Sequence, residues 1–239
     1  MKKKIKVGNV TLGDGNIYIQ SMLNVRAEDI QNSVKQAKEL EKAGCRIIRA
    51  AVPRLECAEL IPALKNAVDI PVVADIHFDY RIALKCAELG VDKIRINPGN
   101  IGAEENVKAV ADVCRKRGIP IRIGVNSGSL EKKVLEKYGS PVPEAFVESA
   151  LENVRLLNKY DFDDIVISIK SSDVKTTIDS YRLLHEQTDY PLHLGVTETG
   201  TAHMGIIKSA IGIGSLLCDG IGDTIRVSLT ADPVEEIYA

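Results

Sequence analysis

One unit recurs along the whole chain: a short apolar-rich strand, a polar loop and an amphipathic helix. The predicted strands are residues 18–22, 45–50, 72–76, 93–97, 121–125, 165–170, 192–196 and 224–229. The predicted helices are residues 29–43, 55–67, 80–89, 103–117, 143–160, 174–188 and 203–217. Strands that alternate with helices indicate a parallel sheet with right-handed crossovers.

The chain has 239 residues, a length at which eight such units are expected to close into one barrel. The prediction is an α/β fold, a (β/α)8 TIM-type barrel, with residues 1–239 as one substrate-binding domain. Asp232 followed by Pro233 predicts the start of a last helix, and about two turns of it are encoded. We therefore expect a truncated last helix, and either a chain that is a fragment or another element that covers that wall of the barrel. An open doubly wound sheet is the alternative, although no G-x-G-x-x-G follows the first strand.

Two connections depart from the regular pattern. Gly13-Asp14-Gly15 lies between the alternating runs 6–12 and 16–21, which predicts a hairpin or short turn at that point. Residues 127–142 form a longer connection at the face where barrel enzymes have their active sites. This segment is expected to act as a lid over that face.

Polar side chains occupy alternate positions of nearly every predicted strand, and the positions between them are mostly Ile, Val and Leu. We call these two sets of alternate positions the polar parity and the apolar parity. Residues 93–100, K-I-R-I-N-P-G-N, are the clearest case. Parallel strands are normally covered on both faces and apolar throughout, so the polar parity is predicted to face the barrel interior. The polar candidates are Gln20, Arg49, Asp75, His77, Arg95, Asn97, Arg122, Asn126, Ser168, Lys170, His193, Thr197, Arg226 and Ser228.

Five cations are predicted to meet at the mouth of this barrel. They are Arg49, Arg95, Arg122, Lys170 and Arg226. The obvious anions there are Asp75 and Glu198, which leaves an excess of positive charge. An unpaired charge in a partly desolvated site costs on the order of several kcal/mol, so we expect a ligand with two or three negative charges, such as a diphosphate. Arginine also grips phosphate oxygens with two parallel hydrogen bonds.

Each of these candidates has a structural alternative. A single inward arginine could belong to an ion-pair layer of the lumen. Asp75 and His77, in D-I-H, could be a metal pair or, with no third ligand apparent, hydrogen-bonding groups. Glu198 could be an acid/base group or a carboxylate that favours a helix start. Gly212 and Gly214 are expected to allow close packing of a helix.

Composition and cysteine usage narrow the class of protein. A net charge of -2 argues against binding to nucleic acid or membranes over the whole surface. No signal peptide or membrane-spanning run is present, so a cytoplasmic location is expected. The five cysteines form no C-x-x-C pair and have no histidine at metal-ligand spacing, so they are expected to be reduced and mostly buried.

Several of these motifs together resemble a known family. They are R-A-A-V-P (49–53), V-A-D-I-H-F (73–78), K-I-R-I-N-P-G-N (93–100), I-G-V-N-S-G-S-L (123–130), I-S-I-K-S-S (167–172), L-G-V-T-E-T-G (194–200) and S-A-I-G-I-G-S-L-L (209–217). This combination closely resembles the 4-hydroxy-3-methylbut-2-en-1-yl diphosphate synthases, iron–sulfur oxidoreductases of the non-mevalonate pathway of isoprenoid biosynthesis. The resemblance covers essentially the whole chain. It implies a reductive ring opening of 2-C-methyl-D-erythritol 2,4-cyclodiphosphate with loss of water.

The resemblance also implies roles for residues. Arg49, Arg95, Arg122, Lys170 and Ser228 would hold the diphosphate, with Arg226 at the same mouth. Glu198 would match the catalytic carboxylate of the family. Asn126 would lie near the substrate, and Asp75 and His77 would line the same pocket; Asp75 and Asn126 are expected to be catalytic together with Glu198, and His77 to bind substrate.

The resemblance further implies a [4Fe-4S] cluster, held in the family by three cysteines and a glutamate of a separate C-terminal domain. This chain lacks that pattern, so no metal ligand is expected here and the chain alone is expected not to turn over substrate. The family forms a homodimer in which the cluster of one subunit covers the barrel of the other. The electron donor is expected to be a flavodoxin, a ferredoxin or a reduced nicotinamide system.

Two other classes stay open on sequence grounds. One is a complete, cofactor-free phosphate-handling barrel, such as an aldolase (a lyase) or an epimerase, with Lys170 as a Schiff-base lysine. The other is a non-catalytic interaction protein whose open barrel wall docks a partner.

Overall fold

The computed structural model describes residues 2–197 and 200–239. Its strands are β1 (Ile5–Val7), β2 (Val10–Leu12), β3 (Tyr18–Met22), β4 (Ile47–Ala51), β5 (Val72–Asp75), β6 (Lys93–Ile96), β7 (Ile121–Asn126), β8 (Ile165–Lys170), β9 (His193–Leu194) and β10 (Thr224–Ile225). Its helices are α1 (Ile30–Ala43), α2 (Leu60–Lys65), α3 (Tyr80–Glu88), α4 (Glu104–Arg117), α5 (Lys132–Tyr138), α6 (Pro143–Asn158), α7 (Val174–Gln187), α8 (Ala202–Cys218) and α9 (Pro233–Tyr238). Short 3-10 segments are η1 (Leu55–Glu59), η2 (Pro98–Asn100) and η3 (Ser127–Ser129).

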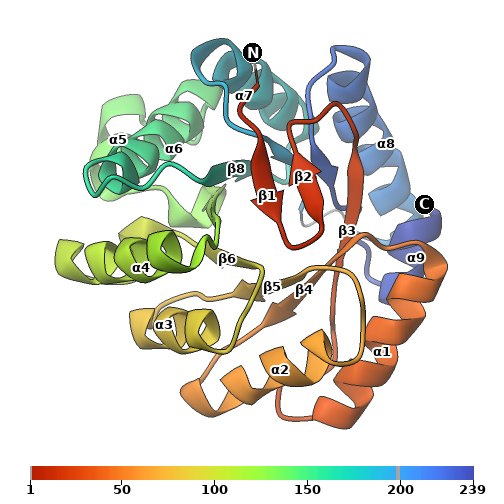
Figure 1. Ribbon diagram of the computed structural model, residues 1–239. Coiled ribbons are helices and arrows are strands. Elements are labelled where there is room, and N and C mark those ends of the chain that lie inside the picture. Colours follow the sequence, from red (N-terminus) through yellow and green to blue (C-terminus); the bar gives the residue numbers. More distant parts are fainter. Residues whose placement is uncertain (1, 198–199) are drawn as a thin grey trace.

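Eight parallel strands form the predicted barrel, in the order β8-β7-β6-β5-β4-β3-β10-β9. The helices surround these strands (Figure 1). The ring closes between β8 and β9 through a bridge that pairs Ile167 with Leu192. At this seam the hydroxyl of Tyr181, on α7, accepts a hydrogen bond from the Ile169 amide and donates one to the His193 carbonyl. The TIM-type prediction is confirmed, and the open doubly wound alternative is wrong.

The apolar parity of the strands packs under the helices. Ile48, Ile94, Ile121 and Ile167 are fully buried in one large core between the strands and the helical layer. This is the arrangement expected when parallel strands are covered by crossover helices. The barrel interior is therefore the place left for the polar parity.

Of the two predictions for Gly13-Asp14-Gly15, a hairpin or a short turn, the structure has the short turn, and the hairpin lies just before it. Strands β1 and β2 pair antiparallel over residues 5–12, which include the single alternating run 6–12 of the sequence, and the chain reverses at Gly8 and Asn9. Gly8 has a backbone φ of +55°, which residues with a side chain rarely adopt. Glycine, which has no Cβ, is therefore suited to this turn position. Gly13-Asp14-Gly15 instead links the hairpin to β3.

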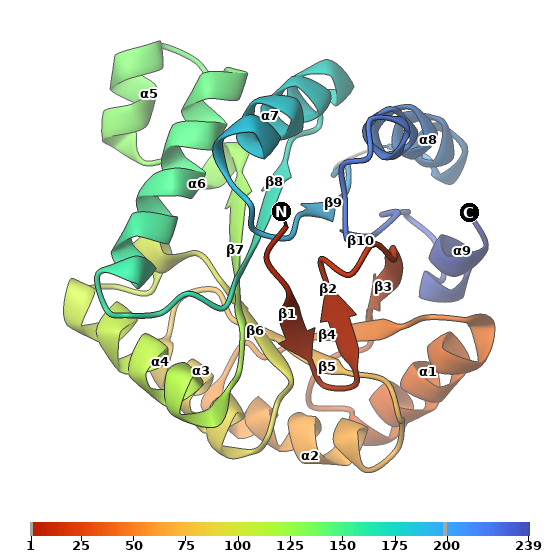
Figure 2. The same cartoon turned by 45° about the horizontal axis from the view of Figure 1, so that its top comes forward.

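The hairpin closes the N-terminal end of the barrel, where Figures 1 and 2 show it lying across the ring of strands. Its four inward residues, Ile5, Val7, Val10 and Leu12, form an apolar cluster with the lowest interior residues of the barrel strands. Those interior residues are Ile47, Val73 and Val166. Water and ligands therefore reach the lumen from the opposite end.

Other boundaries differ in detail. The predicted helix 55–67 is split into η1 and α2, because Pro62 has no N–H and can lie only in the first turn of an α-helix. The long connection 127–142 contains the short helix α5. The last helix, α9, begins as predicted: Asp232 caps it by accepting a hydrogen bond from Val234 N at 2.9 Å. No helix in the described ranges combines the length and the apolar character needed to cross a lipid bilayer.

Candidate functional site

Most of the polar parity is buried inside the barrel, as the strand alternation predicts. The residues concerned are Gln20, Asp75, Lys93, Arg95, Arg122, Ser168, Lys170 and His193. Each lies on a β-strand whose opposite parity packs against helices. The interior is therefore a polar layer between the apolar hairpin end and the open mouth.

Asp75, at the end of β5, is the central anion of this layer. Its Oδ2 lies 2.5 Å from Arg49 Nη2 and 3.4 Å from His77 Nε2, and its Oδ1 lies 3.1 Å from Arg95 Nη1. Burial would raise the pKa of Asp75, but the charges of Arg49 and Arg95 and the hydrogen bond with His77 outweigh it. The pKa of this carboxyl is therefore held well below its usual range, and Asp75 is ionised.

The D-I-H motif thus forms a hydrogen-bonded ion cluster. His77 lies partly exposed above Asp75, and Phe78, beside it, is largely exposed at the rim. No group of three or more metal-ligating side chains occurs among the described residues.

Four interior basic residues, Arg49, Lys93, Arg95 and Arg122, have unsatisfied donors within the described part of the barrel, and those of Arg122 and Lys93 are the most notable. Arg122 Nε and Nη1 and Lys93 Nζ are buried without a hydrogen-bond partner. Burial and the charges of Arg122 and Arg49 lower the pKa of Lys93 well below its usual range. Orphaned buried donors are costly, so they indicate groups that await a ligand or water.

Lys170 ends β8 at the mouth. It lines a cavity of about 180 Å³ together with Asn126, Ser127, Gly128, Ser172 and Thr197. Burial and the charges of Arg226 and Arg122 hold the pKa of Lys170 well below its usual range. Asn126 is its register partner on β7, so an ammonium or amine and an amide meet at this cavity.

Glycines make room for two of these cations. A Cβ on Gly124 would lie 2.6 Å from Arg95 Nε, and one on Gly195 would lie 2.9 Å from Lys170 Nζ. Such distances are shorter than real contacts allow, so any side chain at Gly124 or Gly195 would push the neighbouring cation aside. Gly124, on β7, and Gly195, just after β9, thereby help to position the charges.

Arg226 was expected to contribute unpaired positive charge at the mouth, but in the structure it is paired with a carboxylate. Its Nε and Nη2 lie 3.1 Å and 3.0 Å from the two carboxylate oxygens of Glu236, on α9, and its Nη1 contacts Met22 Sδ. Glu236 also accepts hydrogen bonds from the Ser21 hydroxyl and the Leu229 amide. Arg226 therefore adds no excess charge to the mouth.

Sequence reasoning missed two residues of this arrangement. Lys93 has the same parity as Arg95, so alternation alone could have placed it in the interior. Glu236 carried no such signal, because nothing local connects a carboxylate on the last helix with an arginine ten residues earlier. With Glu236 assigned to Arg226, the described interior holds five basic side chains, those of Arg49, Lys93, Arg95, Arg122 and Lys170, against the single carboxylate of Asp75.

Two further predicted residues complete the account. Glu198 lies outside the described residues. Ser228 is half-buried just past β10, on the side of the barrel where Arg226 lies. Gly212 packs as expected, since a Cβ there would lie 2.7 Å from Val196 Cγ2, whereas Gly214 has no neighbour within 4 Å of that position.

The predicted lid segment is anchored to the barrel wall. Asn153, buried on α6, donates a hydrogen bond from Nδ2 to Glu131 Oε1 at 3.1 Å. That same oxygen would lie 3.3 Å from a Cβ on Gly99, in the loop after β6. The segment therefore rests on the N-P-G-N turn that follows Arg95.

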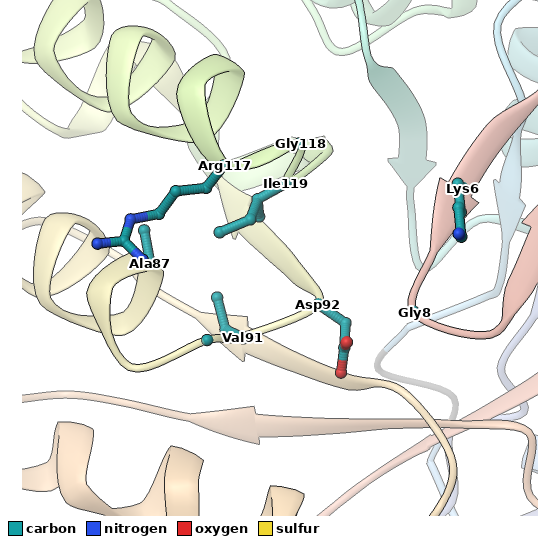
Figure 3. Close-up of a pocket in the computed structure, with 9 residues that line it drawn as sticks. Lys6, Gly8, Ala87, Val91, Asp92, Arg117, Gly118 and Ile119 are labelled. Carbon is teal, nitrogen blue, oxygen red and sulfur yellow. The ribbon is translucent and has the colours of Figure 1, made fainter.

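A larger hollow of about 430 Å³ lies at the other end of the barrel, lined by Lys6, Asp92, Arg117 and neighbouring residues. Figure 3 shows that its charged side chains do not converge: Arg117 extends away from both Asp92 and Lys6. Asp92 is already paired with Lys65 at 2.6 Å. The hollow also lies at the N-terminal ends of the strands, whereas barrel enzymes work at the C-terminal ends. The cation-lined mouth is therefore the candidate site.

The described cysteines do not form a ligand set. Cys45, Cys57, Cys86 and Cys114 are buried and Cys218 is exposed. Burial raises the pKa of Cys45 to about 11 and those of Cys86 and Cys114 to about 12. An iron–sulfur cluster needs several thiolates at one place, so the cysteines present do not fit one.

Comparisons with known proteins support the barrel fold. Solved structures similar in fold include dihydropteroate synthase from Stenotrophomonas maltophilia, with TM-score 0.69 and 14% identity over 98% of this chain and 96% of that one. Type I 3-dehydroquinate dehydratase from Clostridium difficile gives TM-score 0.66 and 17% identity over 100% and 97%. At these identities the likeness concerns the barrel fold alone.

Sequence relatives are much closer. The chain is 61% identical over 236 residues to the 4-hydroxy-3-methylbut-2-en-1-yl diphosphate synthase (flavodoxin) of Clostridium perfringens, covering 98% of this chain and 68% of the relative. It is 58% identical to the enzyme of that name from Proteus mirabilis, covering 98% and 63%. The chain thus spans about two thirds of the length of these relatives. Residues 2–239 match the GcpE TIM-barrel domain, and the chain belongs to the GcpE family of 4-hydroxy-3-methylbut-2-en-1-yl diphosphate synthases.

Proposed function

We propose that residues 1–239 are the substrate-binding barrel of a 4-hydroxy-3-methylbut-2-en-1-yl diphosphate synthase, an oxidoreductase of isoprenoid biosynthesis. The observation that carries the proposal is the excess of buried cations over the single carboxylate of Asp75 in the described interior. A diphosphate supplies the negative charge that this interior lacks. Family membership supports the same ligand class, because the relatives are named for an allylic diphosphate.

The substrate in this proposal is 2-C-methyl-D-erythritol 2,4-cyclodiphosphate, whose ring is opened reductively with loss of water. Arg49, Arg95, Arg122, Lys170 and Ser228 bind the diphosphate, and His77 lies at the edge of the same site. Each charge-assisted hydrogen bond to a phosphate oxygen contributes roughly 1.5–3 kcal/mol. Arg226 acts from beside the site, since its guanidinium is held by Glu236.

The proposal gives the carboxylates different tasks. Asp75 stays ionised because its pKa is held low, so it positions Arg49 and Arg95 and does not donate a proton near neutral pH. Glu198 carries the catalytic acid/base role that the family motif implies. Asn126 presents its amide to substrate in the cavity beside Lys170.

The [4Fe-4S] cluster of the family would supply the electrons for the reduction. The described residues contain no set that fits it, so this barrel contributes binding and orientation, and the cluster is proposed to belong to a separate domain. Flavodoxin is the proposed electron donor, as the names of the relatives state for those enzymes. A homodimer, implied by the family resemblance, and a cytoplasmic location, expected from the sequence, belong to the same proposal.

Calorimetric titration with the cyclic diphosphate tests the proposal. Arg95→Ala and Lys170→Ala are each expected to weaken binding by about tenfold or more, through loss of a charge-assisted hydrogen bond. The matched controls are Arg117→Ala, at the opposite end of the barrel, and Lys38→Ala, on the exposed face of α1; both should bind like the wild type. Absence of binding by folded protein, or equal binding by all four variants, refutes the proposal.

One observation favours a second candidate. Lys170 is a buried lysine with a lowered pKa, the property that a Schiff-base amine needs. A cofactor-free lyase acting on a phosphorylated carbonyl compound would use it. Borohydride trapping of an adduct on Lys170 would support that candidate, and failure to trap any carbonyl phosphate would exclude it.

A further inference from the structure

Lys93 is a buried amine with no partner for its charge among the residues that the structure describes. It is the first residue of β6 and has no exposed surface. Within the described residues its Nζ has no hydrogen-bond partner. Buried lysines that serve only the fold are normally paired, so this one calls for another explanation.

The surroundings of Lys93 are cationic on one side and apolar on the other. Its register partner on β5 is Val73, which belongs to the apolar cluster under the hairpin. The charged groups that act on it are Arg122 on β7 and Arg49 on β4. Across the interior, His193 on β9 is also buried and is uncharged, because burial and the nearby cations hold its pKa well below its usual range.

No carboxylate is free to compensate this charge among the residues described. Asp75 is committed to Arg49 and Arg95. Arginine stays protonated in proteins, whereas lysine can lose its proton. Of the cations that face one another here, Arg49 and Arg122 therefore keep their charges and Lys93 is the group that gives up its proton.

We propose that Lys93 is neutral in the empty barrel and takes up one proton from solvent when a diphosphate binds at the mouth, so that it helps this site to select polyanions. The inference rests on the proposed function, because it needs an anion at the mouth. It adds to that function a residue outside the expected binding set. Lys93 acts through Arg122 and Arg49 and is a positioning residue.

The physical reason is electrostatic coupling. An anion beside Arg122 and Arg49 cancels their repulsion of an ammonium group at Lys93, and the pKa of Lys93 rises. The proton taken up adds a positive charge beneath the ligand and opposes the surplus negative charge that the ligand brings. A diphosphate should drive this uptake further than a monophosphate, because it carries more negative charge.

Calorimetric titrations of the folded chain with the cyclic diphosphate at pH 7.5, in buffers of different ionisation enthalpy, count the protons taken up on binding. Lys170 and His193 also have lowered pKa values and can contribute, so the informative quantity is the difference between variants. The wild type should take up about one proton more than Lys93→Met, as the linkage between binding and protonation requires. The control Lys108→Met removes an exposed lysine of α4 and should leave the count unchanged.

The pH dependence of affinity gives a second readout. Each proton taken up makes the dissociation constant rise by up to about tenfold per pH unit as pH increases. The wild-type slope between pH 7 and 9 should therefore exceed that of Lys93→Met by about one. A merely structural role for Lys93 would shift the affinity at every pH and leave the slope unchanged, which would overturn the inference.

A third measurement observes the lysine directly. In protein labelled with ¹³C at lysine Cε, the buried-lysine signal that is missing from Lys93→Met, and so is distinct from that of Lys170, should move from the neutral to the charged chemical shift on binding. Binding without such a shift, or without proton uptake, overturns the inference and leaves the proposed function intact. Absence of any binding overturns both.

Discussion

Asp75 Oδ2 lies 2.5 Å from Arg49 Nη2, and through this contact one carboxylate joins two strands of the barrel interior. Its other oxygen holds Arg95 from the neighbouring strand β6. The two arginines are thereby fixed, and the Nε of each is buried without a hydrogen-bond partner among the described residues. Because Asp75 already holds Arg49 and Arg95 in place, little further ordering of these side chains is needed when an anion binds.

Removing the carboxylate should destabilise the fold. Asp75→Asn leaves two buried guanidinium groups without their shared partner, and we expect the free energy of unfolding to fall by about 3–5 kcal/mol. Urea denaturation at pH 7 measures this change. Asp112→Asn breaks only exposed pairs on α4 and should cost less than about 1 kcal/mol.

The same residue predicts a pH dependence of stability. The pKa of Asp75 is lower in the folded protein than its ordinary value of 3.8. A depressed pKa contributes stability that is complete above the unfolded value and is lost as pH falls toward the folded one. The stability difference between wild type and Asp75→Asn should therefore be constant from pH 7 to about 5 and shrink below about pH 4. A difference that grows on acidification would contradict this assignment.

Arg226 and Glu236 attach the last helix to the barrel. Glu236→Gln leaves Arg226 with a weaker partner in a largely buried position, and we expect a loss of about 2–3 kcal/mol in the free energy of unfolding. In Glu236→Gln, amide hydrogen exchange should become faster in α9 by a larger factor than in α1. Asp219→Asn, which breaks the exposed pair with Arg182, is the matched control and should have little effect.

Gly124→Ala should weaken anion binding. The added Cβ would lie 2.6 Å from Arg95 Nε, so the guanidinium must move away from its present place beside Asp75. We expect affinity for the cyclic diphosphate to fall by about tenfold, the loss of one charge-assisted hydrogen bond. Gly214→Ala, where the added methyl meets nothing within 4 Å, should bind normally.

Tyr181 should stabilise the seam that closes the barrel. Tyr181→Phe leaves the Ile169 amide and the His193 carbonyl each without a buried partner, and we expect a cost of about 1–3 kcal/mol. Faster hydrogen exchange at the Ile169 amide is the local readout. Tyr238→Phe changes an exposed ring and should leave both quantities unaltered.

Strand alternation predicted much of the site because it is a local property. The side chains of Arg95, Arg122 and Lys170 were expected in the interior from period-two patterning, and the structure buries all three there. Helix and strand order predicted the closed barrel for the same reason. The sequence left residues 13–15 open between a hairpin and a short turn. Two glycine-containing turns lie five residues apart, and only the packing of Ile5, Val7, Val10 and Leu12 under the barrel makes the earlier one the hairpin.

The sequence by itself determined that cationic side chains from distant strands share one lumen, since chain geometry sends alternate residues to the same face. Only the tertiary structure decided which of those charges are neutralised. Glu236 reaches Arg226 because α9 packs beside β3, and Asp75 reaches both Arg49 and Arg95 because β4, β5 and β6 are neighbours in the ring. Ion pairing depends on distances of a few ångströms between groups far apart in the chain, and a local pattern does not contain those distances.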